Sequence, residues 1–360
     1  MNPGLLRISR NRRWLVKGAL PALTLALAFT VVSQAETVFP GAHWAKGDPL
    51  ELGVNSSALD SLASEIHGQG MVIKDGYLVK SWGAMDRRGD IYSAGNAVFA
   101  TLLFFAVEEG RVGTVEDPVQ KFLWDLDPKD KSMRLSHLLN MTSGYARPEL
   151  PGAAWAYRNL GMQLFQMTLF DRIFQAPAVA SALHRDRLAK LEFEDAPVFR
   201  DRTNTLIAST RDFARLAWLW CQQGRWGQTQ LLPRGYFERY LRPQVESGVP
   251  VTFDTEDNDY LGIGNYRDES DYFGKYGPGI YGCGWWFNAT GPLHPDDRTW
   301  PDLPKDTFMA IGIRGSVAAV VPSLNLMLVT TYADWGEFRP GDQDSLYNQW
   351  MARLVGAVAE

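Results

Sequence analysis

The chain has 360 residues, of which 46% are hydrophobic and 12% aromatic, so it is long enough to bury one large core or two ordinary ones. Disordered, collagen-like, solenoid and low-complexity classes are excluded, because charged residues make up 21%, glycine and proline are at ordinary levels, and no internal repeat occurs. The net charge is -5, and beyond residue 35 there are 31 basic against 41 acidic residues, which argues against a nucleic acid as partner.

The N-terminal residues have the pattern of an export signal. A basic segment precedes an apolar run over 18–32, and Ser-Gln-Ala at 33–35 offers small residues at both positions that a signal peptidase reads. We predict a cleavable signal peptide over 1–35 and not a membrane anchor, because the run is short for a spanning helix and Pro21 interrupts it. Paired arginines in 11–17 favour twin-arginine export over general secretion. The expected location is periplasmic or secreted, in a bacterium, with no stable membrane span after cleavage.

Strand and helix signals follow one another along the mature chain. An Asp-Gly turn between two β-rich triplets predicts a hairpin over 71–79. An almost wholly apolar segment, 97–109, precedes Gly110 and predicts a buried helix with a glycine C-cap. Further helices are predicted at 135–141, 162–174, 210–223 and 344–358, and strands at 284–288, 308–312, 317–321 and 326–331. This order predicts an α+β fold, with a helical block inserted between parts of one antiparallel sheet.

Several common site signatures are absent from the sequence. No serine lies in a Gly-x-Ser-x-Gly elbow, and the five histidines are scattered, so neither an α/β-hydrolase site nor a metal site is expected. The glycines of 277–282 match a dinucleotide fingerprint, but strand-like residues follow, and we interpret the segment as a loop. No cofactor is implied. Cys221 and Cys283 either pair or pack, and the sequence leaves both open.

Ser93 stands immediately before the predicted buried helix. Its hydroxyl would lie at a helix N-terminus, where backbone N–H groups and the helix dipole favour a developing negative charge. Taken alone, the residue has two interpretations: an ordinary N-cap or a catalytic nucleophile.

The segments around Ser93 decide between these interpretations. In chain order they are 91–96 (Ile-Tyr-Ser-Ala-Gly-Asn), the apolar helix, 135–144 (Leu-Ser-His-Leu-Leu-Asn-Met-Thr-Ser-Gly), 157–159 (Tyr-Arg-Asn), 209–215, 224–233 and 312–325. Together they resemble the serine β-lactamase and penicillin-binding protein superfamily, most of all its class C branch, which includes family VIII carboxylesterases and 6-aminohexanoate-dimer hydrolases. The resemblance implies a β-lactamase-like sheet part from 36–92 and 225–360, a helical part from 93–224, and an active site between them.

The resemblance also implies roles for individual residues. Ser93 matches the acylated nucleophile of the Ser-x-x-Lys motif, and Tyr157 matches the tyrosine that shuttles the proton to the leaving group. Asn159 matches the asparagine that holds substrate, and Ile313-Arg314-Gly315 falls on the third motif, Lys-Thr-Gly in many relatives. The oxyanion hole would be formed by the backbone N–H groups of Ser93 and Ser316.

The sequence departs from this family at Asn96, where the family has its lysine. A carboxamide cannot take the proton of a serine hydroxyl, so the usual general base is missing. Three interpretations follow: Tyr157 acts as base if Arg158 or Arg314 stabilises its phenolate, or the chain is a pseudoenzyme, or Asn96 is an introduced substitution. The third motif lacks its usual lysine as well.

The expected function is therefore an exported serine hydrolase that acts on an ester or amide through an acyl-serine, slowly or on a specialised substrate. The alternative is a catalytically inactive protein that binds an acyl, peptide or cell-wall-like ligand. Trp155 and Trp286 would form an aromatic wall for an apolar group or, in the simpler interpretation, pack in the core. The acidic segment 252–271 is predicted to be a long loop near the mouth of the site. The sequence does not determine the oligomeric state.

Overall fold

A seven-stranded antiparallel sheet is the largest element of the computed structural model, which describes Met1 and residues 37–201, 205–252, 258–264 and 273–358. The strand order is β2-β1-β12-β11-β10-β9-β8, so the N-terminal hairpin lies at one edge and the strands that follow the helical segments complete the sheet. The strands are β1 Gln69–Lys74, β2 Tyr77–Trp82, β8 Tyr281–Gly282, β9 Trp285–Phe287, β10 Phe308–Gly312, β11 Ser316–Val321 and β12 Leu326–Thr331. The predicted signal segment lies outside the described residues, Met1 apart.

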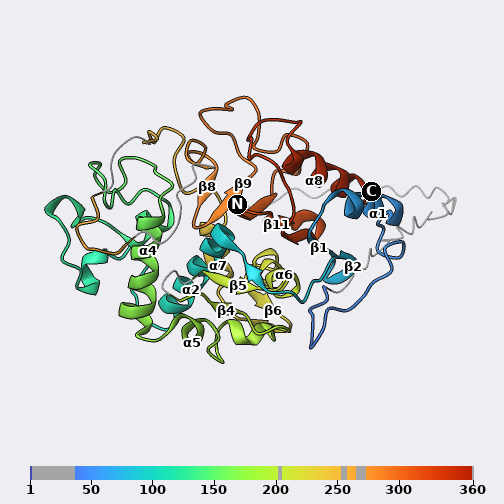
Figure 1. The fold of residues 1–360 in the computed structure, drawn as a ribbon, viewed down its shortest axis with the longest axis horizontal. Helices are drawn as coiled ribbons and strands as arrows, with labels where there is room; N and C mark the ends of the chain where they lie inside the picture. The colour runs from blue at the N-terminus through green and yellow to red at the C-terminus, as the bar shows by residue number, and fades with distance from the viewer. Residues whose placement is uncertain (2–36, 202–204, 253–257, 265–272, 359–360) are drawn as a thin grey trace. The chain divides into compact units, whose positions relative to one another are not determined.

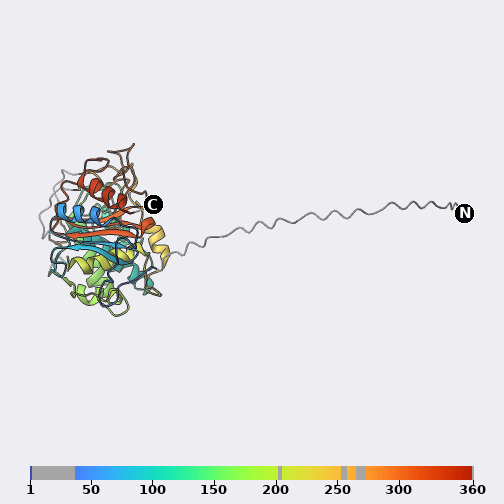
Figure 2. The ribbon, with the colours of Figure 1, turned by 90° about the vertical axis from the view of Figure 1, so that its right-hand side faces the viewer.

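Helices cover both faces of this sheet. The packed pair α1 (Ser56–Glu65) and α8 (Leu346–Gly356) lies on one face, and α6 (Thr210–Cys221) packs against β1, β11 and β12 from the other (Figure 2). The described helices that complete the other side are α2 Asn96–Glu108, α3 Leu135–Leu139, α4 Asn159–Met167, α5 Ala178–Ala182 and α7 Arg234–Tyr240. From residue 36 onward the chain packs as one compact unit around a continuous core.

Short elements connect these larger ones. Two small sheets are also present. In one, β5 Leu206–Ala208 lies between β3 Gly89–Asp90 and β4 Val198–Phe199; in the other, β6 Arg225–Trp226 pairs with β7 Thr229–Gln230. The 3-10 helices are η1 Tyr92–Gly95, η2 Val119–Phe122, η3 Pro128–Asp130, η5 Leu188–Leu191 and η6 Pro322–Leu324, and Thr168–Phe174 (η4) is a π-helix. None of the described helices has the length and apolar character needed to cross a membrane.

The predicted α+β architecture is confirmed, as are most of its elements. The hairpin turns at Asp75 and Gly76, both with positive φ, which is the backbone of a type I′ turn. The predicted helix 162–174 corresponds to α4, which begins earlier, at Asn159, and to the π-helix that follows it. The hydrogen-bond spacing changes at Thr168. The interpretation of 277–282 as a loop is wrong at its end, since Tyr281 and Gly282 pair with β9. The boundaries predicted between a sheet part and a helical part stay predictions.

The centre of the molecule is α2. Every residue from Asn96 to Ala106 is buried, which fits a helix that is apolar on all sides (Figure 1). In the middle of α2, the buried Thr101 hydroxyl is satisfied: it donates to the carbonyl of Ala97 at 2.8 Å and accepts from the indole of Trp220 at 3.0 Å. The helix is thereby held between α6 and the strands.

Two glycines let the sheet approach the start of α2. A Cβ on Gly312, the last residue of β10, would lie 2.3 Å from the carbonyl oxygen of Ile91 and 3.1 Å from the amide nitrogen of Ala94. A Cβ on Gly284, between β8 and β9, would lie 2.4 Å from the amide nitrogen of Ala97, and its φ is +90°. Neither position has room for a side chain, because backbone meets backbone there.

We predict that Gly284→Ala destabilises the fold by about 2 kcal/mol or more, because it combines a steric clash with a strained φ. Urea unfolding measures the effect. Gly248→Ala is the matched control, since a Cβ there has no neighbour within 4 Å. Equal stability of the two variants would contradict the close approach.

Candidate active site

Ser93 lies in η1, the single 3-10 turn that leads from β3 into α2. Its carbonyl accepts the backbone N–H of Asn96, and its side chain is partly exposed. Gly95 is the N-cap of α2, and no side chain caps either helix, so Ser93 is not an ordinary N-cap. Just before it, Tyr92 has φ +51° and its N–H donates to a carboxylate oxygen of Asp90 at 2.7 Å. The hydroxyl is therefore presented from a tight, hydrogen-bonded turn at the start of a buried helix.

Asn96 joins Ser93 to Tyr157. The side-chain amide of Asn96 donates to the Tyr157 hydroxyl at 3.4 Å, although the two residues are 61 positions apart. Asn96 is 5% exposed, whereas Tyr157 is partly exposed. The three residues that sequence analysis placed at the centre of the site are thus brought together around the start of α2.

A second phenol, Tyr281, stands beside Asn96. Complete burial raises its pKa well above the usual value, and the neighbouring Tyr157 adds to that effect, while Asn96 opposes it. Tyr281 is therefore a neutral phenol at physiological pH. The sequence suggests Tyr281 only as one of the aromatic residues near Tyr157, core packing being the simpler interpretation; its place beside Asn96 has no local signal.

Aromatic side chains surround Tyr157 on its buried side. Its ring centroid lies 5.8 Å from that of Trp155, 6.1 Å from Trp286, 5.3 Å from Phe273 and 5.9 Å from Tyr281. Trp155 and Trp286 are 0% and 1% exposed, so they are packed in the core and hold Tyr157 in place. Their contact with a ligand stays a prediction.

The segment 313–315 forms the turn between β10 and β11. Arg314 and Gly315 have φ values of +56° and +68°, Arg314 is exposed, and its guanidinium lies 5.8 Å from the ring centroid of Tyr92. Ser316 opens β11, and its hydroxyl donates to the carbonyl of Asp90 at 3.3 Å. A Cβ on Gly315 would meet the backbone of Ala333, so this glycine packs against the chain and not against Ser93.

Two further residues tie the site together and were not identified from the sequence. Gly312, and not Gly315, makes the close approach to η1; a glycine inside a strand pattern is the signal that could have found it. The side-chain oxygen of Asn140 accepts the backbone N–H of Cys283 at 2.9 Å, which anchors the turn next to Gly284. Asn159, in contrast, begins α4 two residues after Tyr157 and is partly exposed.

Neither a reactive thiol nor a metal centre is found among the described residues of this site. Cys221 and Cys283 are free and buried, and burial raises the pKa of both thiols, so neither is a reactive thiolate. Among the described residues, no group of three His, Cys, Asp or Glu side chains is arranged to hold a metal ion. The chemistry this arrangement offers is that of a serine hydroxyl, a phenol and an amide.

The chain belongs to the beta-lactamase family, whose model matches residues 67–294. An uncharacterized protein of Alkalihalophilus pseudofirmus is 22% identical over 265 residues, which are 64% of this chain and 69% of that protein.

Solved structures share the fold. A putative 6-aminohexanoate-dimer hydrolase from Bacillus anthracis superposes with a TM-score of 0.57 at 16% identity, covering 84% of this chain and 83% of that one. A putative beta-lactamase from Bacteroides dorei gives 0.57 at 17% identity (84% and 96%), and a beta-lactamase/D-alanine carboxypeptidase from Yersinia pestis gives 0.55 at 16% identity (86% and 100%).

The described part of the predicted loop 252–271 is anchored by Asp259. Its carboxylate accepts hydrogen bonds from the Tyr145 hydroxyl and from the backbone N–H groups of Ile263 (3.1 Å) and Gly264 (2.7 Å). Burial raises the pKa of Asp259, but the hydrogen bonds lower it by more than burial raises it. The pKa of Asp259 is therefore below its usual value of 3.8. Residues 253–257 and 265–272 of the loop lie outside the described part.

We predict that Asp259→Asn lowers the melting temperature at pH 7 and that the difference disappears as the pH falls below about 4. A carboxylate with a lowered folded-state pKa stabilises the fold above its unfolded-state pKa, and this contribution is lost as the pH falls through the folded-state value. Thermal melts across this pH range measure it. Asp296→Asn, at an exposed carboxylate, is the control; a pH-independent difference for Asp259→Asn would contradict the assignment.

Proposed function

We propose that the protein is a slow or specialised serine hydrolase that acts on an ester or amide through an acyl-serine at Ser93. The observation that carries this proposal is the hydrogen bond from the Asn96 amide to the Tyr157 hydroxyl, beside the turn that presents Ser93. It supports a working arrangement of nucleophile and proton carrier in which an amide takes the place of the family's lysine. The class C branch, with its esterases and 6-aminohexanoate-dimer hydrolases, is the proposed subgroup.

In this mechanism, Tyr157 accepts the Ser93 proton during attack and returns it to the leaving group. The Asn96 N–H stabilises the phenolate by a hydrogen bond, but it supplies no positive charge, which is the reason for a low rate. Removing one member of a catalytic unit typically lowers the rate by about 10⁴ to 10⁶. An activated ester, with its good leaving group, is the substrate least affected by this loss.

The oxyanion hole is proposed to use the backbone N–H groups of Ser93 and Ser316. The Ser316 hydroxyl bonds the carbonyl of Asp90 in the strand just before η1, which supports a fixed distance between the two segments. Arg314, over the ring of Tyr92, is proposed to meet a polar or anionic part of the substrate, and Asn159, at the start of α4, is proposed to hold substrate as well.

A binding protein without turnover is the second candidate. The specific observation in its favour is that two of the described neighbours of Tyr157 are unable to take a proton. Asn96 is a carboxamide, and Tyr281 is a buried neutral phenol. In this case Ser93 would contact an acyl, peptide or cell-wall-like ligand without reacting.

Export is part of the proposal and rests on the sequence of residues 1–35. A periplasmic or secreted location, reached by the twin-arginine route, would give the site access to extracellular or cell-wall esters and amides.

The test is hydrolysis of a short-chain p-nitrophenyl ester by the native protein, Ser93→Ala and Asn96→Lys. We expect slow turnover that Ser93→Ala abolishes and that Asn96→Lys raises about 10²-fold or more, because an amine can act as the base. Asn258→Lys adds the same charge at an exposed position and is the matched control. Mass spectrometry of the quenched reaction locates the acyl group.

The outcomes separate the two candidates. Equal rates for native protein and Ser93→Ala, with activity appearing only in Asn96→Lys, would establish the binding protein. No Ser93-dependent rate and no acyl-serine in either background would overturn acyl-serine chemistry altogether.

A further inference from the structure

A cavity of about 350 Å³ lies between α2 and α7, away from Ser93. It is lined by Val107, Thr114, Val115, Pro233, Gly235, Tyr236, Arg239 and Tyr240. Val107 stands eleven residues beyond Asn96 on α2, which places it about 16 Å along the helix from the start of the candidate active site. The cavity is therefore a separate place on the molecule, at the other end of the same helix.

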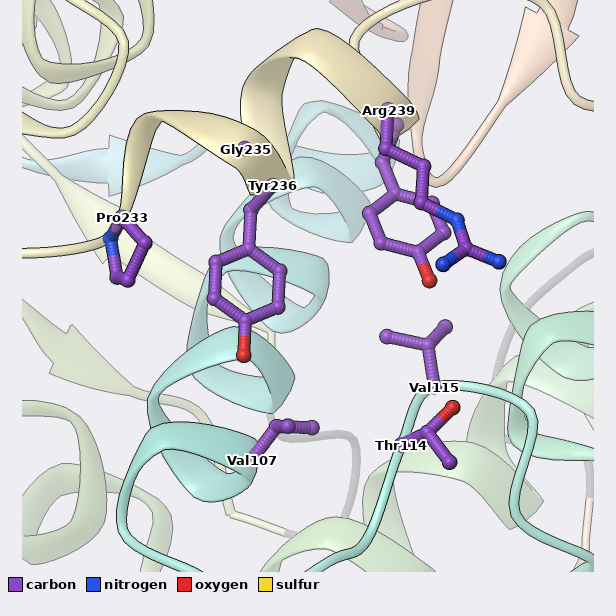
Figure 3. A pocket seen from close by; sticks show the side chains of 8 residues that line it. Val107, Thr114, Val115, Pro233, Gly235, Tyr236 and Arg239 are labelled. Atoms are coloured by element: carbon purple, nitrogen blue, oxygen red, sulfur yellow. The ribbon is translucent and has the colours of Figure 1, made fainter.

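Aromatic and apolar groups form the walls of this cavity. Phe104 of α2 stacks on Tyr236 and Tyr240, with ring centroids 4.9 and 5.3 Å apart, and this fixes both tyrosines. Figure 3 shows Tyr236 reaching from α7 toward α2, with Val107 below it, while Val115 and Thr114 face α7 from the neighbouring loop. A volume of this size suits a small molecule with an apolar body.

The carboxylate nearest Tyr236 is already engaged. The Tyr236 hydroxyl donates to Glu108 at 2.7 Å, and burial together with this hydrogen bond raises the pKa of Tyr236, so the phenol stays neutral. Glu116 accepts from the Ser136 hydroxyl at 2.7 Å and pairs with Arg134 at 3.5 Å. No acidic side chain lines the cavity itself.

The unengaged polar groups of the cavity are donors. The Arg239 guanidinium makes no hydrogen bond or ion pair with any residue that the structure describes, and it lies 5.3 Å from the ring centroid of Tyr240. The Tyr240 hydroxyl also has no partner among the described residues, and burial raises its pKa, so it carries a proton. The Thr114 oxygen accepts the N–H of Glu116 at 2.9 Å, which leaves its hydrogen to donate. One cation and two hydroxyl donors beside apolar walls are complementary to an anion with an apolar body.

We propose that this cavity is a second ligand site, for a small aromatic carboxylate. The carboxylate binds the Arg239 guanidinium and the hydroxyl of Tyr240 or Thr114, and the ring lies against Tyr236 and the two valines. Because Val107 and Phe104 belong to α2, an occupant also contacts the helix that begins at Asn96.

Calorimetric titration of the purified protein with 2-naphthoate, and with neutral 2-naphthylmethanol, tests the proposal. We expect saturable binding of the naphthoate and about tenfold weaker binding of the alcohol, because the alcohol lacks the charge that pairs with Arg239. Arg239→Gln should weaken naphthoate binding about tenfold, whereas Arg234→Gln, on the same helix but paired with Glu238, should change it by less than about twofold.

Gly235→Leu provides a test that does not depend on charge. A Cβ at Gly235 has no neighbour within 4 Å and the residue lines the cavity, so a leucine there fills the space without straining α7. We expect loss of naphthoate binding with an unchanged or higher melting temperature. Hydrogen exchange should show protection by naphthoate over 104–116 and 233–241.

Three results would overturn the proposal. One is the absence of saturable naphthoate binding at millimolar concentration. Another is equal binding by Arg239→Gln and Arg234→Gln. The third is protection around 91–97 in place of 104–116, with binding unaffected by Gly235→Leu, which would place the ligand at the Ser93 site.

Discussion

Direct contact between the sheet backbone and the start of α2 is the constraint on which the candidate site depends. Gly312 lies against Ile91 and Ala94, and Gly284 lies against Asn96 and Ala97, so the end of β10 and the turn between β8 and β9 both reach the start of α2. A side chain at either position would push the strand away. The Asn140 bond to the backbone of Cys283 holds one of these contacts from the helical side. Direct contacts between backbone atoms therefore hold the start of α2 in place against the sheet.

At the start of α2 a neutral amide, that of Asn96, donates to the Tyr157 hydroxyl. In the proposed mechanism this amide takes the place of the family's lysine, and the rings of Trp155 and Trp286 pack against Tyr157 on its buried side. A hydrogen bond can orient a phenol and partly stabilise its anion, but it cannot replace the electrostatic effect of an ammonium group. The proposed acyl transfer would therefore proceed with a low driving force for removal of the serine proton.

The helix α2 links this site to the cavity under α7. Its N-terminal end carries Asn96, and its last turns supply Val107 to the cavity wall and Glu108 to Tyr236. Because α2 is buried from Asn96 to Ala106 and packed on all sides, a contact at one end is made to the same rigid element as a contact at the other. The candidate site and the cavity thus lie at the two ends of one helix: the first has neutral and aromatic side chains, and the second has aromatic walls and the Arg239 guanidinium.

The sequence alone determined most of the elements and predicted the residues of the candidate site. Alternating and continuous apolar patterns, the Asp75-Gly76 turn and the apolar segment before Gly110 specify strands and helices locally, because those signals lie within a few residues of one another. Ser93, Asn96 and Tyr157 were found through motifs, which are also local. The tertiary structure alone decided that Gly312 makes the close approach, that Tyr281 stands beside Asn96, and that Arg239 lines the cavity with Val107. These facts depend on which distant segments meet when the chain closes on itself, and no pattern within a short window of sequence encodes such a meeting.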